Sequence, residues 1–197
     1  MLYNIFGVQV HSIDIKSFDK VENKLIQYCY QEKKKDPVGV HFSNRGGWQS
    51  KSHGFRESLL CSLIHQSIGD YFQENNIFKE GIRIEMANMW ININKKGDYN
   101  ILHDHPRCDM SGVLWIKIPE ESGNLVMEHN SSFAAEHMLN CYSEEMRKTF
   151  SAYQNWVFSP QSGKIVLFPS YIRHFVGENE SRHDRISVSF NMHIHTS

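Results

Sequence analysis

Two histidines that stand two positions apart are the residues of this chain with the clearest capacity for chemistry. His103 and His105 lie in the segment 97–106, which opens with Gly-Asp and closes with proline. In a β-strand, residues i and i+2 point to the same face, so both imidazoles would project together. Histidine is the commonest metal ligand at neutral pH. The pair therefore indicates a metal site, although either ring could instead lie on the surface or bond to the backbone.

His174 and Arg185 extend this pattern. His174 opens a strand after the apolar, proline-broken run 163–173, and it would supply a third ligand if that strand lies opposite the first pair. Arg185 alternates with apolar residues and shares a strand face with Ser187. An arginine that points into a barrel needs an anion, because an unpaired buried charge is costly. Its planar fork suits a carboxylate, and the alternative is an arginine on a solvent-facing edge.

The hydrophobic periodicity predicts a mixed first part, 1–80, and a β-rich core, 81–195, within a single domain, 1–197. The first part is expected to hold an opening strand, a helix between an N-cap signal at Ser17 and Pro37, a loop at 43–50, and a second helix from Leu59 to Asn76. After residue 82 the period becomes two. Strands are expected at 82–86, 89–93, 111–118, 124–128, 164–168, 174–176 and 185–195. Many short strands with regular turns predict a barrel or sandwich, interrupted by a partly helical loop at 131–158.

Composition narrows the protein class. The net charge is -1 and 40% of residues are hydrophobic, which is typical of a globular protein and argues against nucleic-acid binding. No apolar stretch approaches the roughly 20 residues of a membrane span. The first residues lack the features of a signal peptide, and the four cysteines form no C-x-x-C pair. We therefore expect a cytoplasmic protein that does not bind membranes.

These residues together resemble the 2-oxoglutarate/iron(II) oxygenase superfamily. Its pattern is Gly-Asp, then His-x-Asp/Glu, a distant His and a following Arg-x-Ser. The matching residues are Gly97-Asp98, His103-x-His105, His174 and Arg185-x-Ser187. The run 103–113 is also similar to a poorly characterised oxygenase subgroup of marine bacteria and phages. The resemblance covers residues 80–194 and implies a mainly β (α+β) double-stranded β-helix, or jelly-roll, with the N-terminal helices packed on one sheet.

The resemblance also implies cofactors. His103, His105 and His174 would hold Fe(II), and 2-oxoglutarate would chelate the iron as cosubstrate. Arg185, with Ser187, would bind the far carboxylate, and Asn100 is a further candidate for cosubstrate binding. The implied enzyme is a dioxygenase that hydroxylates a small molecule or a peptide. The sequence does not specify that substrate, and a homodimer is left open.

One position departs from the superfamily pattern. His105 stands where the common two-histidine, one-carboxylate site has its carboxylate, so the site would carry one negative charge less. Asp104 could be a ligand only if the strand kinks near Pro106, and Asp109 is a candidate for orienting a histidine.

Two other functions remain open from the sequence. A cupin-like metal enzyme that does not use 2-oxoglutarate suits three histidines, although Arg185-x-Ser187 argues against it. A non-catalytic jelly-roll binding protein is the other alternative.

Overall fold

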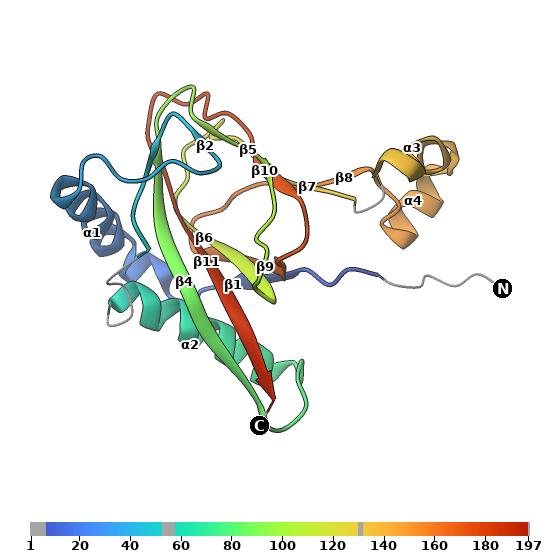
Figure 1. Ribbon diagram of the computed structural model, residues 1–197, viewed down its shortest axis with the longest axis horizontal. Coiled ribbons are helices and arrows are strands. Elements are labelled where there is room, and N and C mark those ends of the chain that lie inside the picture. The colour runs from blue at the N-terminus through green and yellow to red at the C-terminus, as the bar shows by residue number, and fades with distance from the viewer. Residues whose placement is uncertain (1–6, 53–57, 130–131, 197) are drawn as a thin grey trace.

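Two antiparallel sheets form the centre of the described structure (Figure 1). The computed structural model describes residues 7–52, 58–129 and 132–196. The larger sheet has the order β1 (His11–Asp14), β9 (Lys164–Pro169), β6 (Met110–Lys117), β11 (Arg185–Thr196), β4 (Ile82–Asn94) and β3 (Trp48–Gln49). The smaller sheet has the order β2 (Asn44–Arg45), β5 (Tyr99–His103), β10 (His174–Val176), β7 (Leu125–Glu128) and β8 (Asn155–Phe158).

Strand β9 of the larger sheet is buried on both faces, which explains its nearly continuous apolar sequence. In β9, Ile165 and Leu167 join the cluster that includes the N-terminal helices. Val166 and Phe168, on the other face, pack with Leu125 of the smaller sheet. Since successive side chains of a strand alternate between faces, an apolar run of this kind fills two cores at once.

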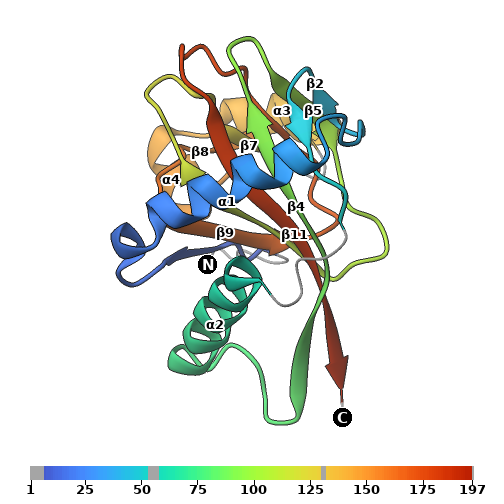
Figure 2. The same cartoon turned by 90° about the vertical axis from the view of Figure 1, so that its left-hand side faces the viewer.

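Two helices from the first part of the chain cover the outer face of the larger sheet. They are α1 (Glu22–Lys35) and α2 (Leu59–Glu74); in Figure 2 α1 crosses in front of β4 and β11, and α2 lies below α1, beside the lower part of these strands. Leu25 of α1 and Ile64 of α2 are buried in the same cluster as Ile91 of β4. The prediction that N-terminal helices pack on one sheet is therefore confirmed. No helix among the described segments combines the length and apolarity of a membrane span.

A serine N-cap marks the start of α2 but not that of α1. The Ser58 hydroxyl accepts a hydrogen bond from the Cys61 amide (3.2 Å), as an N-cap residue does, and α2 begins at the next residue. The N-cap signal at Ser17 is wrong for α1. Ser17 instead precedes the 3₁₀ turn η1 (Phe18–Lys20), and α1 begins only at Glu22, without a side-chain cap.

Three segments contain more strand or helix than the sequence indicated. The expected loop at 43–50 contains the two-residue strands β2 and β3, which pair with β5 and β4. The segment 131–158 contains α3 (Ser132–Cys141), α4 (Glu144–Phe150) and the edge strand β8. The strands expected at 82–86 and 89–93 form one strand, β4.

A β-bulge in β4 joins those two expected strands. Asn191 of β11 pairs with Asn88, but the next residue, Met192, pairs with Met86, so Ala87 is the extra residue. The bulge changes which positions face the helices. Before Ala87, even-numbered residues such as Met86 face the helices. After Ala87, odd-numbered residues such as Met89 face them. The upper half of β4 therefore points its even-numbered polar residues toward the smaller sheet.

Candidate metal centre

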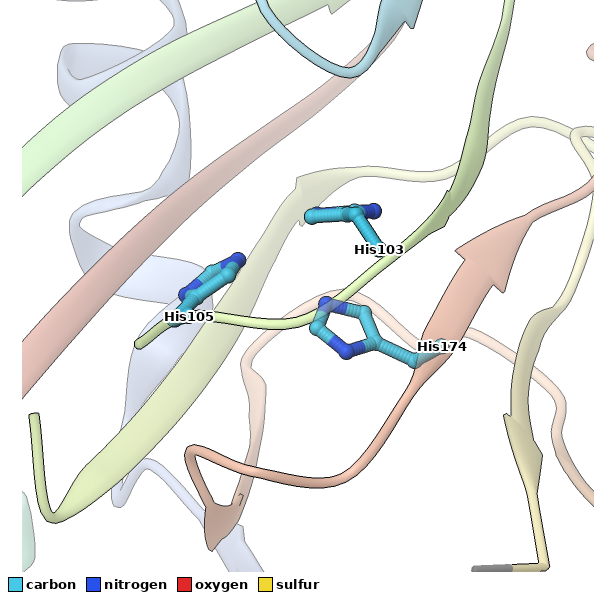
Figure 3. A group of neighbouring side chains, drawn as sticks. All are labelled: His103, His105 and His174. Carbon is cyan, nitrogen blue, oxygen red and sulfur yellow. The ribbon is translucent and has the colours of Figure 1, made fainter. Parts of the chain in front are cut away.

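The pairing of β5 with β10 brings two of the three predicted histidines together. His174, the first residue of β10, lies directly opposite His103, the last residue of β5. His105 lies just beyond the end of β5, not within a regular strand as expected, yet its ring lies 5.1 Å from each of the other two ring centroids. Figure 3 shows the three rings around a common space. One nitrogen from each ring lies within 4.8 Å of the others, so the three could share one metal ion.

Backbone carbonyls orient two of the rings. Nδ1 of His103 lies 2.7 Å from the Ile101 carbonyl oxygen, and Nδ1 of His174 lies 2.9 Å from that of Ile172. A carbonyl oxygen only accepts, so each Nδ1 must carry the proton. Each Nε2 then keeps its lone pair, which is the state that a metal ligand requires.

Side chains orient the third ring. Nδ1 of His105 lies 2.6 Å from Oδ1 of Asn191 and 3.0 Å from Oγ of Ser111. The Ser111 hydroxyl donates to the same Asn191 oxygen at 2.7 Å. Neither residue was singled out from the sequence, although each is a polar residue in a strand whose neighbours are buried and apolar.

Burial keeps the three imidazoles neutral. It lowers the pKa of His103 and of His105 below the ordinary value of 6.5. It lowers the pKa of His174 to about 3, with a further lowering from the neighbouring His103. Removing a cation from water is unfavourable, so the protonated form is the one that burial destabilises. All three rings are therefore ready to bind a metal at neutral pH.

The two aspartates considered as alternatives lie elsewhere. Asp104, which stands between His103 and His105 in the sequence, is exposed. The cluster of possible metal ligands contains His105 and not Asp104. Asp109 does not orient any of the three rings. Its Oδ2 accepts a hydrogen bond from the Ile194 amide at 2.8 Å and lies 3.6 Å from Nδ1 of His193.

Arg185 points into the molecule from the start of β11 and is only 2% exposed. Its Nη1 donates to the carbonyl oxygens of Ser122 and Gly177, the latter at 3.0 Å. Nη2 is buried and meets no acceptor among the residues that the structure describes. Burial lowers the pKa of Arg185 to about 10, so the guanidinium remains charged at neutral pH. A buried cation with a free donor is suited to an anionic ligand.

The histidines and Arg185 line the same inner cavity. Ser187 is buried on the inner face of β11 and lines it too, as does Asn100, whose Nδ2 donates to Oγ of Ser43 at 3.1 Å. The apolar part of the lining includes Trp115, Leu125, Phe168 and Val176. All the predicted site residues thus come together around one cavity.

A wider cavity of about 680 Å³ opens beside the histidines toward the surface. His103, His105, Trp90 and Ser43 line both cavities. The segment 40–52 supplies much of the outer wall, including Phe42, which is 74% exposed. The loop that the sequence marked at 43–50 therefore lies over the site. Among the aromatic residues nearby, Trp115 lines the inner cavity, whereas Trp156 and Tyr171 are exposed.

The donor set fits Fe(II) with 2-oxoglutarate. Imidazole is a suitable ligand for iron, and three ligands on one side of a metal leave positions open for a chelating cosubstrate. Nη2 of Arg185, which has no partner within the described part of the chain, supplies the charge and the geometry that a second carboxylate would need in the same cavity.

Comparison with known proteins agrees with this chemistry. Residues 88–191 match the model of a protein family described as "Putative 2OG-Fe(II) oxygenase". The chain belongs to this oxygenase family. The match spans more than half of the chain and includes all three histidines and Arg185. No curated protein matches the sequence significantly.

Solved structures resemble the oxygenase over almost its whole length. A prolyl-4-hydroxylase from Pseudomonas putida has a TM-score of 0.59 at 14% identity, covering 95% of this chain and 92% of that one. A viral collagen prolyl hydroxylase from Paramecium Bursaria Chlorella virus-1, in complex with 2OG, has a TM-score of 0.59 at 14% identity, covering 93% and 94%. The epimerase SnoN of nogalamycin biosynthesis, with Fe³⁺ and α-ketoglutarate, has a TM-score of 0.67 at 9% identity, covering 95% and 80%.

These likenesses confirm the predicted double-stranded β-helix. The family confirms the predictions of an Fe(II)- and 2-oxoglutarate-dependent oxygenase over the cupin-like and non-catalytic alternatives. The individual ligand assignments stay predictions.

Proposed function

We propose that His103, His105 and His174 hold Fe(II) in this oxygenase, and that Arg185 binds the far carboxylate of 2-oxoglutarate. The observation that carries this proposal is one cavity lined by three imidazoles and by a buried guanidinium whose Nη2 meets no acceptor among the described residues. When bound, Fe(II) and 2-oxoglutarate supply oxygen activation coupled to decarboxylation of the cosubstrate. The reaction we propose is hydroxylation of a substrate C–H bond.

The chain contributes orientation and exclusion of water. Hydrogen bonds to Nδ1 orient the imidazoles and leave Nε2 of each ring with its lone pair for the metal. Arg185 aligns the cosubstrate by a charge-assisted contact, and Ser187 and Asn100 line the same cavity. The surrounding apolar side chains, such as Phe168 and Trp115, keep the cavity poor in water, which strengthens these polar contacts.

The outer cavity is the proposed substrate site. Its volume of about 680 Å³ lies within the range of small-molecule sites, roughly 300–1,000 Å³, and would also admit the side chain of a peptide. Phe42 and Trp90 offer aromatic surface there, whereas Lys51 already pairs with Asp36 at 2.9 Å. A largely apolar substrate, a small molecule or a peptide, suits this wall.

The test is Fe(II) binding by anaerobic equilibrium dialysis. His103→Ala and His174→Ala should each lose the stoichiometric iron that the parent protein binds, with the fold preserved by circular dichroism. His193→Ala is the matched control, because it removes an imidazole of β11 outside the cluster. Full iron occupancy in either triad variant would refute the assignment.

A further inference from the structure

We propose that Asn191 is a positioning residue that makes His105 a metal ligand in place of the usual carboxylate. The inference rests on the proposed function, since it assumes that His105 binds iron. It concerns why an imidazole can stand at this position.

Asn191 makes the shortest contact to the His105 ring. Its Oδ1 lies 2.6 Å from Nδ1, and it also accepts the Ser111 hydroxyl at 2.7 Å. An amide oxygen only accepts, so it fixes the proton of His105 on Nδ1. The lone pair of Nε2 is thereby left for the metal, as the two backbone carbonyls achieve for the other rings.

The amide of Asn191 is itself held in one orientation. Its Nδ2 donates to Oδ1 of Asn88 at 2.8 Å, which turns its oxygen toward His105. Asn88 and Asn191 are cross-strand partners directly beside the β4 bulge at Ala87. The bulge sets the phase of β4 so that Asn88 faces the site, as bulges near active sites often do.

The same amide disfavours a carboxylate at position 105. The first side-chain atoms of aspartate and histidine overlap, so one carboxylate oxygen would lie near the present Nδ1. It would then face Oδ1 of Asn191 at about hydrogen-bond distance, with no proton between two acceptors. The amide oxygen of Asn191 as acceptor and the Nδ1–H of His105 as donor are thus complementary. This pairing accounts for the departure of His105 from the superfamily pattern.

The experiment reads both the proton position on His105 and metal affinity. Histidine side-chain ¹⁵N shifts distinguish the Nδ1–H and Nε2–H tautomers in metal-free protein at pH 8, and His105→Ala assigns the signal. In the parent, His105 should be wholly Nδ1–H. In Asn191→Ala it should become a mixture, and Fe(II) affinity should fall by about 10- to 100-fold. Asn191→Asp, which keeps the acceptor, should retain the Nδ1–H tautomer. Asn155→Ala, an exposed asparagine of β8, is the control.

Parent-like tautomer and iron affinity in Asn191→Ala would overturn the proposal. Loss of the Nδ1–H tautomer in Asn191→Asp would also overturn it. If Asn191→Ala does not fold, Asn88→Ala removes only the anchor of the amide. It should give a smaller version of both effects, and an unchanged tautomer would count against the proposal.

Parallel measurements separate this proposal from the proposed metal site. If His103→Ala and His174→Ala lose iron but Asn191→Ala retains it, the metal site is supported and only the positioning role is refuted. Retention of iron in both histidine variants would instead refute the metal site itself.

Discussion

Replacing Arg185 should weaken 2-oxoglutarate binding far more than iron binding. The guanidinium is 2% exposed, and its Nη2 has no acceptor among the described residues. Truncation to alanine would leave the far carboxylate of the cosubstrate buried and unpaired. The cost should be roughly 2–5 kcal/mol, or about thirtyfold to several thousandfold in affinity. Arg185→Lys should recover only part of this loss, because an ammonium lacks the planar fork.

The assay for Arg185 is calorimetric titration of 2-oxoglutarate into anaerobic protein saturated with Fe(II). Iron affinity without cosubstrate should be unchanged, since Arg185 is not a ligand. Alanine should also reduce stability, because Nη1 no longer binds the carbonyls of Ser122 and Gly177, so folding is checked first. Arg83→Ala, an exposed arginine of β4, is the matched control. Parent-like affinity for 2-oxoglutarate in both Arg185 variants would refute the reasoning.

Two further predictions concern stability. Because burial lowers the pKa of His174 to about 3, metal-free protein should become less stable below pH 6.5, where the unfolded chain takes up the proton. The loss from this residue should reach about 2 kcal/mol at pH 5, and urea unfolding of His174→Phe should show a shallower pH dependence; equal slopes would contradict it. Gly112→Ala should cost about 1–3 kcal/mol, because its Cβ would lie 2.6 Å from Cε2 of buried Phe190. Gly69→Ala on α2, with open space around it, should not destabilise, and equal melting temperatures for the two variants would disprove the clash.

Alternation made most of the strands predictable. Ile186, Val188 and Phe190 of β11 face the helices, and the residues between them face the site, so one pattern located both the core and the arginine. In β4 the apolar positions change from even to odd between Met86 and Met89. In the sequence, that change indicated a boundary between two strands. The structure shows that it results from a β-bulge within one strand.

Short strands and polar contacts across the barrel were not predictable in the same way. The strands β2, β3 and β8 exist through pairing with distant partners, so no local pattern marks them. Asn191 contacts a histidine 86 positions away, so no local sequence pattern links the two residues. The three histidines were recognisable because histidine is the commonest metal ligand at neutral pH and because their spacing matches a known pattern.

Binding of Fe(II) and 2-oxoglutarate at one three-histidine site is the central claim. Anaerobic titration followed by visible absorption tests it most directly, because a keto acid chelated to Fe(II) gives a charge-transfer band. The parent protein should develop this band at one equivalent of Fe(II), only when 2-oxoglutarate is present, and His174→Ala should not. Absence of the band in the parent at saturating Fe(II) and 2-oxoglutarate, or a full band in His174→Ala, would contradict the account.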